Sequence, residues 1–330
     1  MADRDRKTVT STVLGLLTLL IWSTSFAFAR SIQDQAGPLF GAACIYLLGG
    51  GLGCVHMLVI QRRGGQFLRM PRGYLLVCGG LFITYIVAVQ VGIGFAPDRR
   101  QAVGVIITNY LWPGLTMALS VPLLGRRARW FLVPGVLLGM VGVLLGVMYG
   151  AGLSVPIAME NLRTHPLPYV LGLVAGVSWA LYSNLSRRLA GPAQVSGVPI
   201  FLLLSGGLLG VMHLFSSEQP HWTRRALLEL AYAAVFPSLL AYSFWEVAMR
   251  YGRISVIVPV SYFTPLLATI ISCLYLGVPM GLGLWLACGL VVVGAILSSR
   301  AVSELMPAEA SNASNKISTA SAAVNRVRCT

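Results

Sequence analysis

Long apolar stretches separated by short polar segments make up most of the chain. Each stretch is close to the 20 or so residues that a helix needs to cross a lipid bilayer. The ten stretches are Val13–Ser31, Pro38–Gln61, Gly73–Ala96, Gln101–Leu124, Trp130–Gly150, Leu167–Ser186, Gly197–Ser216, Ala226–Arg250, Ile254–Leu276 and Gly281–Ser299. Short connections predict that neighbouring helices run antiparallel. The pattern therefore predicts an all-α integral membrane protein with ten transmembrane helices.

The remaining segments are polar and few. We expect residues 1–12 to form a cytoplasmic N-terminal arm, residues 151–166 an extracytoplasmic loop, and residues 300–330 a disordered cytoplasmic tail rich in Ala, Ser and Asn. The composition agrees with this reading, because 56% of the 330 residues are apolar, only 10% are charged, and mean hydropathy is +0.78. Soluble domains carry about 25% charged residues, so a water-soluble globule is excluded.

The distribution of basic residues orients the chain. With the N-terminus in the cytoplasm, 18 of the 24 Lys and Arg residues fall on cytoplasmic segments. The other side holds Arg30, Arg99, Arg100, Arg163, Arg224 and Arg225. Such a bias places both termini in the cytoplasm. The net charge of +14 thus reflects membrane orientation, and because no aromatic residues interleave the basic clusters, we expect no nucleic-acid partner.

The first and second halves of the sequence are similar to each other. A shift of 157 residues places Trp22 on Trp179, and a shift of 152 places Tyr110 on Tyr262 and Pro113 on Pro265. Each half, 13–150 and 167–299, contains five stretches, and an odd number means that the second half enters the membrane with the opposite orientation. Inverted repeats of this kind build transporters whose substrate site lies near the bilayer midplane. We therefore predict two inverted five-helix repeats around a central cavity.

At this level the sequence resembles the drug/metabolite transporter superfamily, with two EamA-type halves at 13–150 and 167–299. The motifs Asn109-Tyr110-Leu111-Trp112-Pro113 and Ser261-Tyr262-Phe263-Thr264-Pro265 resemble the YddG-type aromatic amino-acid exporters. The resemblance implies a multi-pass protein of the inner membrane that exports Phe, Tyr and Trp, and related drugs, by alternating access. The alternatives are a broad multidrug or metabolite exporter, a sugar-phosphate or nucleotide-sugar carrier of the same superfamily, and a channel or scaffold.

The fourth and ninth stretches contain the sharpest candidates for substrate binding. Pro113 removes a backbone donor and loosens the preceding turn, so Asn109, Tyr110 and Trp112 are expected to line a cavity. Tyr and Trp rings can stack on an aromatic substrate, and an amide can bind its amino or carboxylate group. Tyr262 occupies the matching position of the second half, in a span that Pro259 and Pro265 should kink.

Other aromatic and polar residues near mid-membrane complete the predicted site. They are Trp22, Tyr85, Gln90, Trp179, Tyr182 and Trp245. A Gln at this depth faces protein or water and not lipid. For the aromatic residues, helix packing is the alternative role.

Glu246 is the only carboxylate deep inside a predicted span, and Arg250 follows four residues later. A buried acid in a membrane protein suggests a proton relay, whereas the i, i+4 spacing favours a structural ion pair. Both roles stay open at this stage.

Catalytic and metal-binding patterns are absent from the sequence. It has no HExxH, GxSxG or Walker motif, and its four histidines and six cysteines show no ligand spacing. We therefore expect no enzyme activity, no metal and no cofactor. Small-xxx-small glycine spacings suit close helix packing and are compatible with a monomer or a homodimer.

Overall fold

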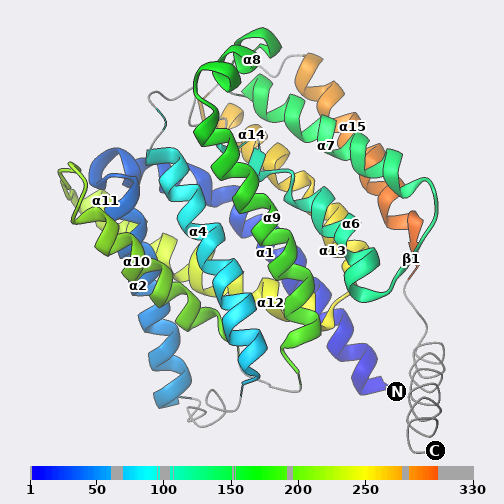
Figure 1. The fold of residues 1–330 in the computed structure, drawn as a ribbon, viewed down its shortest axis with the longest axis horizontal. Coiled ribbons are helices and arrows are strands. Elements are labelled where there is room, and N and C mark those ends of the chain that lie inside the picture. Colours follow the sequence, from blue (N-terminus) through cyan, green and yellow to red (C-terminus); the bar gives the residue numbers. More distant parts are fainter. Residues whose placement is uncertain are drawn as a thin grey trace, which may run out of the picture.

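The computed structural model describes residues 2–60, 70–94, 96, 105–106, 108–150, 152, 154–191, 196–276 and 282–303. Nearly all of these residues are helical (Figure 1). The α-helices are α1 (Ala2–Ala36), α2 (Pro38–Val55), α4 (Gly79–Gly94), α6 (Trp112–Leu124), α7 (Leu132–Gly150), α8 (Val155–Thr164), α9 (Pro166–Leu189), α10 (Val198–His213), α11 (Arg224–Ala233), α12 (Ala241–Tyr251), α13 (Ile254–Ser261), α14 (Phe263–Leu276) and α15 (Leu282–Ala301). Three π-helical segments, η1 (His56–Ile60), η2 (Tyr74–Cys78) and η3 (Ala234–Leu240), continue or precede α-helices.

The length and hydropathy of the helices identify a membrane protein. Six of the described helical stretches are long and apolar enough to cross a membrane, and four shorter apolar helices accompany them. The long stretches are Asp5–Thr24, Pro38–Ile60, Tyr74–Gly94, Leu132–Tyr149, Pro166–Leu189 and Arg224–Tyr251. The prediction of an all-α membrane protein is confirmed at this level, and every predicted apolar stretch contains at least one helix.

The structure differs from the sequence prediction at several boundaries. Helix α1 begins at Ala2, so residues 2–12 extend the first helix and do not form a separate arm, because no Pro or Gly interrupts them. The segment 151–166, predicted as a loop, contains helix α8, which begins at Val155 after the N-cap Ser154 and has Pro156 in its first turn. The predicted tail lies outside the described residues from 304 onward.

The kink predicted for the ninth stretch is confirmed. Helix α13 ends at Ser261 and α14 begins at Phe263, with Pro259 and Pro265 on either side of the break. Proline prevents a continuous ladder here because it lacks an N–H group. The eighth stretch is also subdivided, because α11 passes into η3 at Ala234 and η3 into α12 at Ala241.

Helices from the two halves of the chain pack on each other throughout the bundle. Helix α2 lies along α10, α7 along α15, α4 along α9 and α1 along α12 (Figure 1). Glycines permit the closest approaches: a Cβ at Gly50 would lie 2.7 Å from Leu203 N, and one at Gly206 would lie 2.7 Å from Leu47 N. Close helix contact through small residues is typical of membrane proteins, where lipid offers no hydrophobic driving force between helices.

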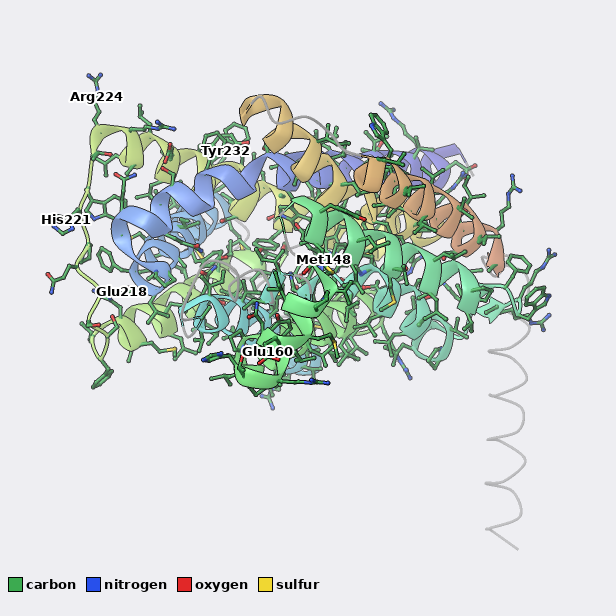
Figure 2. The ribbon with its side chains drawn as sticks, turned by 90° about the horizontal axis from the view of Figure 1, so that it is seen from above. Met148, Glu160, Glu218, His221, Arg224 and Tyr232 are labelled. Atoms are coloured by element: carbon green, nitrogen blue, oxygen red, sulfur yellow. The ribbon has the colours of Figure 1, made fainter. Side chains whose placement is uncertain are left out.

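The connection between α10 and α11 is fastened to the start of α2. Both oxygens of Glu218 accept backbone N–H groups, from Leu39 and Phe40, at 2.9 Å, and His213 Nδ1 lies 3.1 Å from Glu218 Oε2. Glu218 therefore caps α2 from a distant part of the chain, a favourable place for a negative charge. Figure 2 shows Glu218, His221 and Arg224 together at this edge of the molecule.

A short pair of strands joins two distant connections. Strand β1 (Arg127–Ala128), between α6 and α7, pairs antiparallel with β2 (Val302–Ser303), which follows α15. The register places Arg127 opposite Ser303. The end of α15 is thereby tied to the turn that precedes α7.

Candidate functional site

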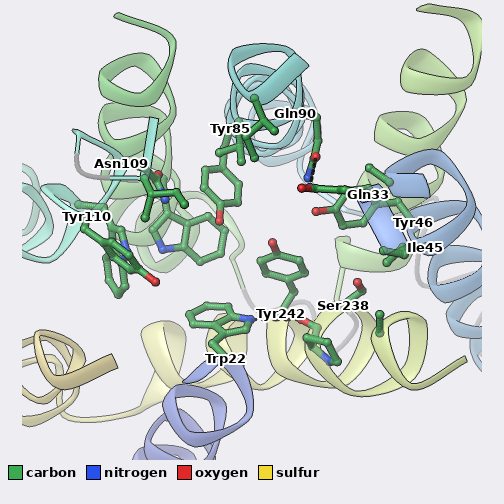
Figure 3. Close-up of a pocket in the computed structure, with 18 of the residues that line it drawn as sticks. Trp22, Gln33, Ile45, Tyr46, Tyr85, Gln90, Asn109, Tyr110, Ser238 and Tyr242 are labelled. Atoms are coloured by element: carbon green, nitrogen blue, oxygen red, sulfur yellow. Dashed lines mark hydrogen bonds between the residues drawn. The ribbon is translucent and has the colours of Figure 1, made fainter. Parts of the chain in front are cut away.

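A cavity of about 240 Å³ lies inside the bundle (Figure 3). This volume is slightly below that of clefts for drug-sized ligands, which suits a ligand of about one amino acid. The residues that line it are Trp22, Gln33, Ala42, Ile45, Tyr46, Tyr85, Val89, Gln90, Ile93, Ile106, Asn109, Tyr110, Trp112, Trp179, Ala233, Pro237, Ser238, Tyr242 and Thr264.

The cavity lies on the side of the bundle where α1 ends and α2 begins. Its lining takes the second half of α1, the first half of α2 and the second half of α4, together with the junction of α11, η3 and α12. Two helix beginnings, those of α6 and α14, also border it. The two parts of the chain that sequence self-similarity relates therefore both contribute to one cavity.

Aromatic rings form most of the cavity wall. The Trp22 ring lies 5.6 Å from that of Trp179 and 5.5 Å from that of Tyr242, and the Tyr85 ring lies 4.7 Å from that of Trp179. Trp22 and Trp112 meet edge to face at 6.5 Å. These separations fall in the range in which aromatic pairs attract, so the rings support one another and present a preformed surface to a flat ligand.

Local helix irregularity positions Trp22. Its indole Nε1–H donates to the backbone carbonyl of Pro237 at 3.2 Å. Pro237 lies within the π-helical segment η3, where proline and the wider turn disturb the regular hydrogen-bond ladder. The Pro237 carbonyl thereby fixes the orientation of the Trp22 ring in the cavity wall.

Neutral polar groups gather on one side of the cavity. Gln33 Nε2 donates to Gln90 Oε1 at 3.2 Å, and the hydroxyl groups of Tyr46, Tyr85 and Tyr242 converge beside this pair (Figure 3). Asn109 lies on the opposite side. Within the described part of the chain, no Lys, Arg, His, Asp or Glu lines the cavity, so its polarity comes from amides and hydroxyls.

A buried polar cluster lies on the other side of the aromatic rings, near the end of α12. Glu246 is fully buried and accepts hydrogen bonds from the hydroxyls of Tyr74 and Ser196. Arg250 Nη1 lies 3.6 Å from Glu246 Oε1, and Arg250 Nη2 donates to the carbonyl of Ala190 at 3.4 Å. The Glu246 cluster, as we call these residues, joins η2, α12, the end of α9 and the segment before α10.

Seven of the predicted substrate-binding residues line the cavity: Trp22, Tyr85, Gln90, Asn109, Tyr110, Trp112 and Trp179. Tyr182 and Trp245 do not line it but pack beside it. The Trp245 ring lies 5.3 Å from that of Trp112 and its Nε1–H donates to Ser183 Oγ at 3.0 Å, and the Tyr182 ring lies 5.2 Å from that of Trp179. These two residues buttress the wall.

Tyr262 does not line the cavity. It packs in an apolar cluster with Val143, Leu266 and Val291, against which Tyr110 also packs. Its repeat mate Tyr110 does line the cavity. The predicted ion pair of Glu246 and Arg250 is present, and neither residue lines the cavity.

Sequence reasoning did not single out several lining residues. The clearest are Gln33, Tyr46, Ser238, Tyr242 and Thr264. Gln33 carried one usable signal, because an amide near the end of a long apolar helix needs a polar partner. Among the described residues, no group of three or more His, Cys, Asp or Glu side chains is placed to hold a metal ion.

Comparisons with known proteins agree with this architecture. Residues 166–300 match the EamA-like transporter family. The chain is 32% identical to the aromatic amino acid exporter YddG of Escherichia coli over 87% of this chain and 96% of that protein, and 30% identical to YddG of Salmonella typhimurium over the same shares. It is 24% identical to an S-adenosylmethionine/S-adenosylhomocysteine transporter of Chlamydia muridarum, over 85% of this chain and 89% of that protein.

One solved crystal structure shows the same fold. It superposes with a TM-score of 0.74 at 24% sequence identity, covering 88% of this chain and 97% of the other.

Proposed function

Because this chain belongs to the YddG family and carries an EamA-like transporter domain, we propose that it exports the aromatic amino acids Phe, Tyr and Trp across the inner membrane. Related flat drugs are further candidate substrates. The observation that carries the proposal is a cavity walled by Trp and Tyr rings with no charged side chain among its described residues. Such a cavity favours a zwitterion with an aromatic side chain over a sugar phosphate, which would need Lys or Arg.

Alternating access between two inverted five-helix repeats, 13–150 and 167–299, is the proposed mechanism. The helix packing supports this, because counterparts from the two halves pair with each other: α2 with α10, and α7 with α15. The other two contacts also match. Helix α4, from the third stretch of the first half, packs on α9, from the first stretch of the second half, and α12 packs on α1 in the corresponding way. Pairing of this kind is what a two-fold axis in the membrane plane produces.

The Glu246 cluster is the proposed cytoplasmic barrier of this cycle. It lies beyond the aromatic rings at the end of α12, where Arg187 Nη1 donates to the carbonyls of Met249 at 3.4 Å and Gly252 at 3.1 Å. The distribution of basic residues assigns the segments that carry Arg187, Arg188 and Arg253 to the cytoplasm. Because the cluster joins four elements, it must come apart when the cavity opens to that side.

Glu246 serves in this scheme as a structural partner of Arg250, and proton coupling through its carboxylate is the rival role. Glu246→Gln separates the two. Loss of the pH dependence of transport assigns proton coupling, and an unchanged pH dependence assigns the structural role.

The proposed function is tested by reconstituting the full chain in liposomes. Uptake and efflux of radiolabelled Phe, Trp and Leu are measured with and without a pH gradient. We expect saturable movement of Phe and Trp, its loss in Trp112→Ala and Tyr110→Ala, and little movement of Leu. Equal movement of Leu would indicate a broad metabolite exporter, and flux that does not saturate would indicate a channel.

A further inference from the structure

Two helices begin inside the bundle at the edge of the cavity. Helix α6 starts at Trp112 after a turn at residues 110–111, and Leu111 provides no side-chain cap. Helix α14 starts at Phe263, directly after the break that ends α13. Since α6 packs against α13, the two beginnings lie close to each other.

The start of a helix is a favourable place for a negative charge. Its first N–H groups have no acceptor within the helix, and the aligned peptide dipoles place a partial positive charge there. Pro113 and Pro265 carry no N–H group, so the groups concerned are those of Trp112 and Gly114 in α6 and of Phe263 and Thr264 in α14. Discontinuous helices in transporters use such ends inside the membrane, where low dielectric strengthens the attraction.

Two polar side chains at these helix starts have buried oxygen atoms without a hydrogen-bond partner in the described structure. Thr264, in the first turn of α14, is 3% exposed and lines the cavity, and its Oγ1 has no hydrogen-bond partner in the described structure. Asn109, just before α6, also lines the cavity, and its buried Oδ1 is unpartnered in the same part of the chain. Buried polar atoms are normally hydrogen-bonded, so a ligand in the cavity could supply the partner that the described residues do not provide for these two groups.

The opposite side of the cavity is chemically different. There Gln33 and Gln90 already bond to each other, and the tyrosine hydroxyls and aromatic faces beside them suit a cation. The cavity is therefore polarised, with helix starts on one side and acceptors and π-faces on the other.

We infer that the starts of α6 and α14, with Asn109 and Thr264, form a subsite for the carboxylate of an amino-acid substrate. The Thr264 hydroxyl and the Asn109 amide, rotated to present its NH₂ group, donate to the carboxylate. The ammonium group then points toward Gln33, Gln90 and the tyrosines. This inference rests on the proposed function and defines how the same cavity orients its substrate.

The subsite is tested by competition against radiolabelled Phe with the full chain in liposomes. The competitors are unlabelled Phe and phenylalaninamide, which lacks the carboxylate and keeps the ring and the ammonium group. For the wild type we expect phenylalaninamide to compete about tenfold less well than Phe or weaker, the loss typical of a missing charged hydrogen bond. Thr264→Val should lower the affinity for Phe by about tenfold and leave the affinity for phenylalaninamide unchanged. Thr264→Ser, which keeps the hydroxyl, should bind Phe as the wild type does.

Asn109→Asp gives a result that misfolding cannot imitate. The added negative charge should weaken binding of Phe and strengthen binding of cationic phenylalaninamide, measured by direct binding of each labelled compound. Equal effects on both compounds, or none, in Thr264→Val and Asn109→Asp would overturn the subsite alone. A wild-type protein that neither binds nor moves Phe would overturn the proposed function and the subsite with it.

Discussion

Replacing Tyr74 by Phe removes one hydroxyl from the proposed cytoplasmic barrier and leaves the ring packed on Phe201. That hydroxyl donates to Glu246 and accepts the backbone N–H of Gly197 at 3.1 Å. A hydrogen bond to a charged group contributes about 1.5–3 kcal/mol and a neutral one about 0.5–1.5 kcal/mol. The closed barrier should therefore lose about 2–4.5 kcal/mol relative to the open one, which shifts the equilibrium by roughly 30- to 1,600-fold.

The native Cys78 is a reporter of this shift. It is fully buried in η2, the same π-helical segment as Tyr74, so a thiol reagent reaches it only when the barrier opens. In a variant whose other five cysteines are replaced by Ala, labelling by a membrane-impermeant maleimide is followed in inside-out vesicles. We expect the labelling rate to rise by at least about 30-fold in Tyr74→Phe, the lower end of the calculated shift.

A matched Tyr-to-Phe change provides the control. The Tyr169 hydroxyl donates to the carbonyl of Ala158 at 3.3 Å, at the end of the molecule away from the Glu246 cluster. Tyr169→Phe should leave the labelling of Cys78 unchanged. Equal labelling rates in wild type and Tyr74→Phe would refute the assignment of the cluster as a barrier.

Three further predictions concern packing and the buried ion pair. Gly206→Ala should lower the thermal unfolding temperature of the purified protein by creating overlap worth about 1–3 kcal/mol, whereas Gly207→Ala, whose Cβ would meet nothing within 4 Å, should be neutral or stabilising. Trp22→Phe should lower stability by about 1 kcal/mol through the lost hydrogen bond to η3, and an unchanged denaturation midpoint would contradict the role of that bond. Arg250→Met should destabilise by about 3–5 kcal/mol, and adding Glu246→Gln should recover part of the loss; a double variant as unstable as the single one would show that the ion pair is not the cause.

The helices were predictable because the requirement to cross a bilayer leaves a strong signal in length and hydropathy. Helix α8 was not predicted, since its ten residues mix Val155, Met159 and Leu162 with Glu160 and Arg163, and none of them is buried. Ser154 and Pro156 are a helix-start signal, but ten residues are too few for the pattern of apolar positions to separate a helix from a loop. The break between α13 and α14, in contrast, followed from two prolines.

The cavity was predictable in part for a similar reason. Trp22 and Trp179 stood out because the chain repeats itself at these positions, and both line the cavity. The same sequence self-similarity gave a wrong prediction for Tyr262. This residue matches the lining residue Tyr110 in sequence, but its ring packs in an apolar cluster with Val143, Leu266 and Val291. Tyr46 and Tyr242 belong to no motif or repeated position in the sequence, and their hydroxyls come together only in the folded chain.

The pairing of helices across the two halves has a consequence for biosynthesis. Helix α2 emerges from the ribosome well over a hundred residues before its neighbour α10, and α7 likewise precedes α15. Strand β1 finds its partner only when residues 302–303 have been made. The glycine faces of α2 and α7 therefore stay in contact with lipid until α10 and α15 have been made, and neither half should mature when expressed without the other.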